Sequence, residues 1–326
     1  MRRDPFAKMN APTKYSIVVP VYGNESGIPL LLDRLAEVTA SLGSEAEVVF
    51  VVDGSPDRSY EKLREALPTV ALRSQLIRHS RNFGSFAAIR TGMSHSTGAY
   101  IAVMAADLQE PPELVLDFFE VLSTDEADVA VGRREGRDDP LLTRFSSGAF
   151  WKVYKRWIFP DMPEGGVDIF ACSRAVANEI LALDESHSSL VGLLYWVGFR
   201  RTEISYRRQP REHGKSGWSF SKKIRYLLDS VFSFTDIPLS LLIAVGTIGT
   251  FFTIVAGVVV FIAFLLGGIQ EPGYTPLMMV ILFSTFTLLI ALGIVGTYVW
   301  RAFENTKRRP GAIVMSRWES HVRADV

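Results

Sequence analysis

Polar side chains follow each of four apolar runs in the first third of this sequence of 326 residues. The fourth run ends at Asp107, with Gln109 two positions later, and the second ends at Asp53. An acid or an amide in such a place can bind a ligand, or it can cap the helix that follows. Capping is the better explanation for any one of these sites alone. The four stretches PVYGNE, VVDGSPD, RHSRNFGS and AADLQ together favour a ligand-binding edge.

Short β-branched runs alternate with helical patterns over the first 210 residues. The runs predict strands at 15–21, 46–53, 72–80 and 99–105. The helical patterns cover 29–42, 59–66 and 85–96. This alternation predicts an α/β domain with a mainly parallel sheet. Because ligands bind beyond the carboxyl ends of strands in such sheets, we expect the four polar strand ends to lie along one edge.

Two long uncharged runs lie near the C-terminus, at 239–268 and 277–300. Each exceeds the roughly 20 residues that a helix needs to cross a ~30 Å hydrocarbon core. Two buried core helices are the alternative, but such lengths without a charge are unusual in a soluble domain. Lysines and arginines flank the pair and are absent from the turn between the runs, so both termini should be cytoplasmic. We therefore expect a multi-pass protein of the cell (inner) membrane, with a transmembrane hairpin at about 239–268 and 276–301 and a cytoplasmic large domain.

A basic stretch, RRQPREHGKSGWSFSKKIRY, leads into the first uncharged run. Alone it would pass as an anchor attracted to anionic lipid. Apolar residues within 220–233 share one helical face and lysines the other, which predicts an amphipathic helix lying on the membrane. The expected divisions are a cytoplasmic domain at 1–215, this interfacial helix at 216–237, two transmembrane helices at 238–302 and a cytoplasmic tail at 303–326.

Charge and cysteine content narrow the class of protein further. The formal net charge is +0, so no global positive field indicates nucleic acid, and no nucleic acid partner is expected. The single cysteine, Cys172, excludes an internal disulfide bond and fits a reducing compartment.

Six motifs, in order, resemble those of the family 2 polyprenyl-phosphate glycosyltransferases. This family includes the bactoprenol glucosyltransferases and, more distantly, dolichol-phosphate mannose synthase. The motifs are VPVYGNE, VVDGSPDRS, RNFGSFAAIRTG, MAADLQEPPEL, GVDIFACSR and REHGKSGW. The resemblance covers nearly the whole length, including both uncharged runs. It implies a GT-A-type nucleotide-sugar-binding domain that inverts the sugar as it moves from a UDP- or GDP-linked donor to a polyprenyl phosphate, for cell-envelope glycosylation.

The resemblance also implies roles for single residues. Asp107 and Gln109 would hold a divalent metal, Mg²⁺ or Mn²⁺, on the donor's diphosphate, and Asp107 and Asp168 would be catalytic. The implied donor-binding residues are Pro20, Tyr22, Glu25, Asp53, Arg81, Asn82 and Gly84. Val52 and Ala105 stand where the family usually has an acid, and this difference leaves the donor's identity open.

The acceptor changes the catalytic requirement. A lipid phosphate is already ionised near neutral pH, so it needs no strong base to become a nucleophile. It needs positive charge that holds it in line with the anomeric carbon. The candidates for this contact are Arg134, Arg137, Arg211, Lys215 and Ser216. Asp168 would orient the acceptor or take up a residual proton, and the sequence does not separate these two roles.

Two other functions stay open. A processive polysaccharide synthase of family 2 would carry a Gln-x-x-Arg-Trp motif, which none of the four glutamines has. The losses at Val52 and Ala105 suggest instead a catalytically inactive, membrane-anchored module that binds a nucleotide-sugar. A homo-oligomer is also left open.

Overall fold

The computed structural model describes two compact units. The described residues are 13–135, 162, 167–183, 185, 189–209, 228–232, 234–235, 237–266 and 273–320. The first unit is an α/β domain that takes in the N-terminal part of the chain and the residues after 309. The second is helical and is formed mainly by 223–308.

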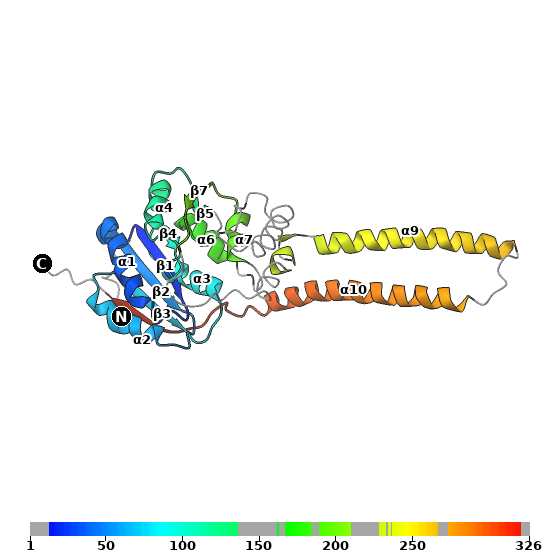
Figure 1. The fold of residues 1–326 in the computed structure, drawn as a ribbon, viewed down its shortest axis with the longest axis horizontal. Coiled ribbons are helices and arrows are strands. Elements are labelled where there is room, and N and C mark those ends of the chain that lie inside the picture. Colours follow the sequence, from blue (N-terminus) through cyan, green and yellow to red (C-terminus); the bar gives the residue numbers. More distant parts are fainter. Residues whose placement is uncertain are drawn as a thin grey trace, which may run out of the picture. The chain divides into compact units, whose positions relative to one another are not determined.

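Eight described strands form one sheet in the order β7-β5-β6-β4-β1-β2-β3-β8 (Figure 1). They are β1 (Tyr15–Val21), β2 (Ala46–Val52), β3 (Ser74–His79), β4 (Tyr100–Val103), β5 (Val129–Arg134), β6 (Phe170–Ser173), β7 (Arg201–Tyr206) and β8 (Val314–Ser320). The β1–β2, β1–β4, β2–β3 and β5–β7 pairs are parallel. The β3–β8, β4–β6 and β5–β6 pairs are antiparallel. The predicted α/β fold with a mainly parallel sheet is confirmed.

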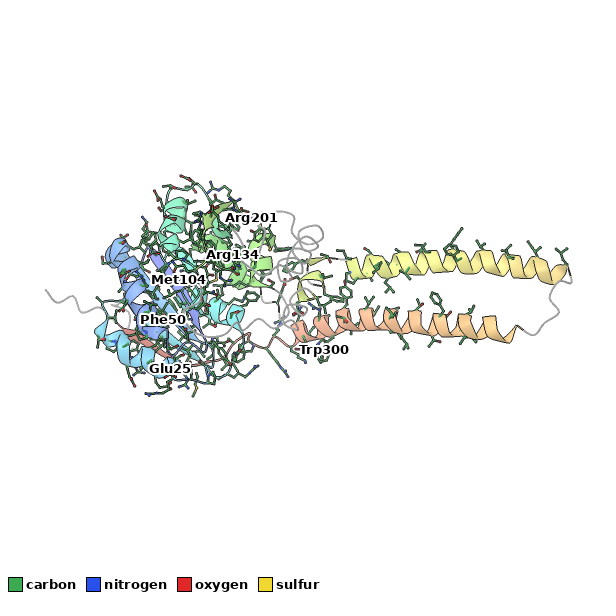
Figure 2. All side chains as sticks on the ribbon, viewed as in Figure 1. Glu25, Phe50, Met104, Arg134, Arg201 and Trp300 are labelled. Carbon is green, nitrogen blue, oxygen red and sulfur yellow. The ribbon has the colours of Figure 1, made fainter. Side chains whose placement is uncertain are left out.

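Helices cover both faces of this sheet, because successive strand residues point to opposite sides. Ile17 and Val19 of β1 pack in one apolar layer with α1, α2 and α4, whereas Val18 packs in the other with α3, α6 and α7. The helices are α1 (Ile28–Leu42), α2 (Ser59–Ala66), α3 (Ser85–His95), α4 (Leu114–Ser123), α6 (Arg174–Ala182) and α7 (Leu190–Trp196). Phe50 of β2 and Met104, just beyond β4, are buried in the domain (Figure 2).

The strand β8 closes the β3 edge of the sheet, although 234 residues separate the two strands along the chain. Trp318 packs against the core, and the Arg64 guanidinium lies 5.3 Å from the centre of its ring. The Tyr60 hydroxyl lies 3.1 Å from the Ser316 hydroxyl oxygen. The sequence predicted a tail at 303–326, and the structure instead places 314–320 in the sheet.

The helical unit contains α9 (Ile237–Leu265) and α10 (Tyr274–Thr306). At about 1.5 Å per residue both helices are longer than a ~30 Å hydrocarbon core. Within the described residues, Phe283–Thr306 is long and apolar enough to cross a membrane, with a mean hydropathy of 1.7, and Ile237–Gly249 is a shorter apolar stretch. The transmembrane hairpin and the interfacial helix, of which 216–227 lies outside the described residues, stay predictions.

Candidate active site

The polar turn after β4 carries the predicted metal ligands. Its base is fixed where the Asn24 side-chain amide donates to the Ala106 carbonyl at 2.8 Å. Leu108 then takes φ 53°, a left-handed conformation that is uncommon outside glycine. The Asp107 Oδ1 atom accepts the backbone N–H of Gln109 across this residue at 3.4 Å. The reversal holds Asp107 and Gln109, both half-buried, on either side of Leu108.

Glu110 ends this turn as a buried carboxyl group that the sequence analysis did not include in the site. It is 1% exposed, and its Oε2 atom has no hydrogen-bond partner among the described residues. Burial, reinforced by the negative charges of Asp168 and Asp107, raises the pKa of Glu110 to about 7. The Arg208 guanidinium acts in the opposite direction, 3.5 Å from the other carboxyl oxygen. Three carboxyl groups therefore share one small region at the sheet edge.

Asp168 lies at the same edge because β6 runs antiparallel to β4, so that β6 begins where β4 ends. The Arg134 guanidinium, at the end of β5, donates to Asp168 Oδ2 at 2.5 Å. The Tyr206 hydroxyl, at the end of β7, donates to the same oxygen at 3.3 Å. Burial, followed by the charges of Asp168 and Glu110, raises the pKa of Tyr206, so the hydroxyl keeps its proton at neutral pH. The two donors fix one oxygen of the predicted catalytic carboxylate.

The Asp53 side chain, which was predicted to bind the nucleotide-sugar donor, forms its hydrogen bonds inside the domain. Its carboxylate is buried and accepts the backbone N–H groups of Phe83 at 2.9 Å and Gly84 at 2.7 Å. It also pairs with the Nδ1 atom of His79 at 2.8 Å, while the Nε2 atom of His79 bonds to Thr91 at 2.9 Å. Asp53 therefore shapes the loop that begins α3, and its contact with the donor stays a prediction.

The loop after β2 lies directly against the loop after β3. Gly54 takes φ +58°, and a Cβ atom there would lie 2.2 Å from the Arg81 carbonyl carbon, so glycine alone fits. Arg81 and Asn82 are exposed above this contact, and the Arg81 guanidinium stacks 4.1 Å from the ring centre of Phe83. Two predicted donor residues are thus presented to solvent beside the strand ends.

The loop after β1 is tied to the start of α2. The backbone N–H of Glu25 donates to Asp57 at 3.0 Å, and the Glu25 carboxylate accepts the N–H of Arg58 at 3.1 Å. Burial acts to raise the pKa of Asp57, but hydrogen bonds from two serines and two backbone groups outweigh it and lower the pKa overall. Pro20 is half-buried and Tyr22 is 53% exposed. Loops from β1, β2 and β3 therefore meet at one edge.

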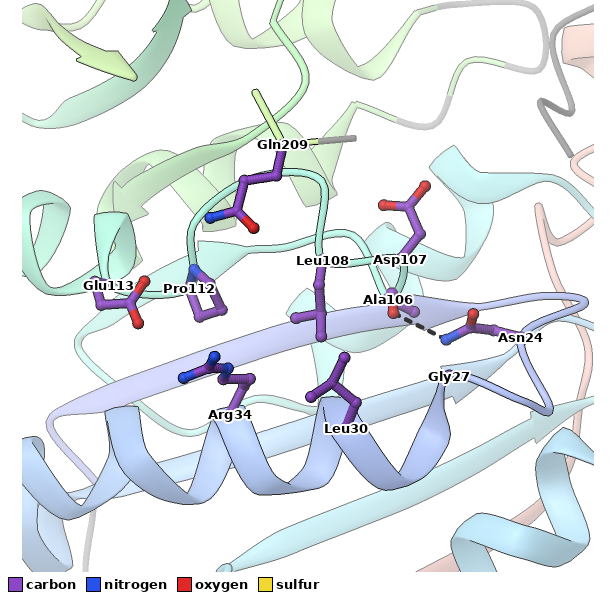
Figure 3. A pocket seen from close by; sticks show the side chains of 10 residues that line it. All are labelled: Asn24, Gly27, Leu30, Arg34, Ala106, Asp107, Leu108, Pro112, Glu113 and Gln209. Carbon is purple, nitrogen blue, oxygen red and sulfur yellow. Dashed lines mark hydrogen bonds between the residues drawn. The ribbon is translucent and has the colours of Figure 1, made fainter. Parts of the chain in front are cut away.

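A pocket of about 110 Å³ lies behind the β4 turn (Figure 3). Leu108 and Leu30 point toward each other inside it, and the Asp107 carboxylate turns away from α1. Ligand pockets for drug-sized molecules have volumes of about 300–1,000 Å³. This pocket is therefore too small to hold a whole nucleotide-sugar.

The structure brings Asp107, Gln109, Asp168 and Arg134 to one edge of the sheet. The other predicted acceptor residues, Arg137, Arg211, Lys215 and Ser216, lie outside the described residues. Three neighbours were missed by the sequence analysis: Glu110, Tyr206 and Arg208. Glu110 stands inside the DLQEPPEL motif, where its closeness to Gln109 was a usable signal. Tyr206 and Arg208 stand at the end of a strand that the sequence pattern did not reveal.

Residues 16–181 match the family described as Glycosyl transferase family 2, just over half of the 326 residues. The chain belongs to glycosyl transferase family 2. An uncharacterized glycosyltransferase of Synechocystis is 31% identical to this chain. The alignment covers 93% of this chain and 95% of the relative. Bactoprenol glucosyl transferase of Shigella phage SfX is 30% identical over 93% of this chain and 99% of the relative.

A solved structure shows the same fold. Glucosyl-3-phosphoglycerate synthase of Mycobacterium tuberculosis, in complex with Mn²⁺, UDP and glucosyl-3-phosphoglycerate, aligns with a TM-score of 0.52 and 13% identity. The alignment covers 68% of this family 2 chain and 80% of the synthase. The predicted GT-A-like architecture is thereby confirmed.

Proposed function

We propose that this family 2 enzyme transfers a sugar from a UDP- or GDP-linked donor to a polyprenyl phosphate at the cytoplasmic face of the cell membrane. The observation that carries the proposal is the similarity to Bactoprenol glucosyl transferase over 93% of the chain. That share is too large to leave out either α9 or α10. The likeness therefore extends beyond the nucleotide-sugar domain to the apolar helices that would bring the site to a lipid.

The chemistry of the β4 turn fits a divalent metal. Asp107 and Gln109 would offer a carboxylate and an amide oxygen, and the carboxyl group of Glu110, whose Oε2 atom has no hydrogen-bond partner in the part of the chain that the structure describes, lies next to them in the turn. A bound Mg²⁺ or Mn²⁺ would neutralise the charge that develops on the leaving diphosphate. Within the part of the chain that the structure describes, no group of three acidic, histidine or cysteine residues could hold a metal alone. The donor's phosphates would complete the ligand set.

The acceptor side of the site is set by Asp168. Arg134 and Tyr206 hold its Oδ2 atom, so its other oxygen is the one that would orient the acceptor or accept a residual proton. The Arg134 guanidinium would hold the attacking lipid phosphate, and Arg211, Lys215 and Ser216 would add to this contact. Attack in a single displacement inverts the anomeric centre.

The position of β8 supports an even number of membrane crossings. β8 pairs with β3, so the chain after α10 returns to the side of the α/β domain. If the span Phe283–Thr306 crosses the bilayer, another segment has to cross as well. α9 has the length to do so, which supports a hairpin whose two ends lie on the same side of the membrane.

The test is transfer of a labelled sugar from UDP- and GDP-sugars to a short polyprenyl phosphate by the purified full chain. A labelled product that extracts into the lipid phase supports the proposal. Nucleotide binding without transfer to any lipid would favour the inactive binding module, and long water-soluble polysaccharide would favour a processive synthase. Thermal stabilisation by each nucleotide-sugar identifies the donor, since a ligand that binds the folded state raises its melting temperature.

A further inference from the structure

Arg208 bridges the two residues that follow Asp107 in the β4 turn. Its Nη2 atom donates to the side-chain oxygen of Gln109 at 2.6 Å, and its Nε atom lies 3.5 Å from Glu110 Oε1. The next residue adds a backbone bond, from Gln209 N–H to the Gln109 carbonyl, at 2.8 Å. The chain beyond β7 is therefore fastened to the turn at three points.

The oxygen that Arg208 occupies is the one that Gln109 would offer to a metal. A guanidinium keeps its charge at any pH at which proteins are folded, so it cannot leave this oxygen by losing a proton. A divalent cation placed on the same oxygen would be repelled by it at close range. Arg208 and the metal should therefore exclude each other at Gln109.

We propose that Arg208 is the resident cation of the donor-free enzyme and competes with bare metal for Gln109. The inference rests on the proposed metal role of Asp107 and Gln109. A metal bound to a nucleotide diphosphate brings negative charge of its own, and this charge gives the displaced guanidinium a new partner. The contact between Arg208 and Gln109 therefore makes the site bind the metal–donor complex in preference to the free metal ion. Arg208 is a positioning residue that acts through Gln109.

The chain offers a matched control in the neighbouring Arg207. Its side chain is 90% exposed and reaches Glu135 only at 3.9 Å. Arg208→Gln and Arg207→Gln remove the same charge one residue apart, so a difference between them reports direct contact and not the general field. Arg208→Met, which keeps a long apolar stem, guards against misfolding of the first variant. Melting curves show which variants are folded.

The experiment measures Mn²⁺ binding by the full chain in detergent, without nucleotide or lipid, from the electron paramagnetic resonance signal of free Mn²⁺. Removing a charge-assisted contact of roughly 1.5 kcal/mol should tighten Mn²⁺ binding about tenfold in Arg208→Gln and Arg208→Met. Arg207→Gln should stay within about twofold of the unmodified protein. A merely structural role would weaken binding and would not tighten it.

Three results would overturn the inference: unchanged or weaker Mn²⁺ binding in both Arg208 variants, an equal gain in Arg207→Gln, or no measurable Mn²⁺ binding in any variant. Transfer of labelled sugar by the unmodified enzyme is measured separately. If transfer occurs but the Mn²⁺ affinities do not change, the Arg208 inference fails alone. If Mn²⁺ binding tightens but no lipid is glycosylated, the proposed acceptor fails alone.

Discussion

The Asp53 carboxylate accepts the backbone N–H of Gly84 at 2.7 Å, across 31 positions of sequence. The bond joins the end of β2 to the residue that begins α3, and the neighbouring N–H of Phe83 and the ring of His79 share the same buried carboxylate. One acid thus determines the shape of a loop whose other residues, Arg81 and Asn82, are exposed at the site.

Asp53→Ala should lower the melting temperature markedly. It leaves the N–H groups of Phe83 and Gly84 without an acceptor, and an unsatisfied buried group costs about 1–3 kcal/mol. For a domain of this size the loss corresponds to roughly 2–12 °C. Asp33→Ala, the same change at an exposed position on α1, is the control and should shift melting only slightly. Equal melting of both variants would contradict the anchoring role.

Asp107→Asn should abolish most metal-dependent transfer and leave the fold intact. Asparagine keeps the size and capping ability of aspartate but lacks the charge that would hold Mg²⁺ or Mn²⁺. We expect at least a hundredfold loss of transfer, checked by metal-titrated assays beside melting curves. Full activity with an unchanged metal requirement would show that Asp107 is not a metal ligand.

Glu110→Gln should stabilise the metal-free protein in alkaline solution. Burial raises the pKa of Glu110 from its usual 4.5 to about 7. Between these values the folded state binds more protons than the unfolded state, so the stability that Glu110 contributes falls as pH rises through this window. The penalty at pH 8 is on the order of 2–3 kcal/mol, and glutamine avoids it. Melting curves with a chelator at pH 5 and pH 8 check this: the gain should be present at pH 8 and mostly gone at pH 5.

Cys172 should not react with thiol reagents in the native protein. It is fully buried in β6, and burial raises the pKa of its thiol to about 12. The thiolate fraction near pH 8 is then on the order of 10⁻⁴. Maleimide labelling should appear only with denaturant, and its onset would report unfolding of the sheet. Rapid labelling of the folded protein would show that β6 opens readily.

Reporter fusions should place the two sides of the apolar pair in different compartments. A fusion at Val326 is expected on the cytoplasmic side, and one in the turn near Glu271 is expected outside. A cytoplasmic signal from both positions, or an external signal from Val326, would rule out the hairpin.

The sequence predicted the parts of the fold that local pattern determines. The strand 15–21 and the helix 59–66 agree with β1 and α2 at both ends, because runs of β-branched residues and helical spacing are local signals. β8 was missed because its VMSRWES contains only one β-branched residue, Val314, and because its partner β3 is far away in sequence.

Some residues of the candidate site could be predicted from the sequence, and others could not. Asp107 and Asp168 were found because strand ends and motifs mark them. The buried position of Asp53 and the contact of Arg208 with Gln109 depend on which loops meet in three dimensions. No periodicity along the chain encodes those meetings.

The last strand also fixes an order of events during synthesis. The ribosome makes β3 early and β8 only after both α9 and α10, so β3 remains an open edge while the apolar helices emerge. Unpaired edges invite pairing with other chains. β8 can close this edge only after both helices have been translated, so the α/β domain is complete only in chains that contain α9 and α10. A prematurely terminated chain would keep the β3 edge unpaired, and chaperones and proteases would act on it.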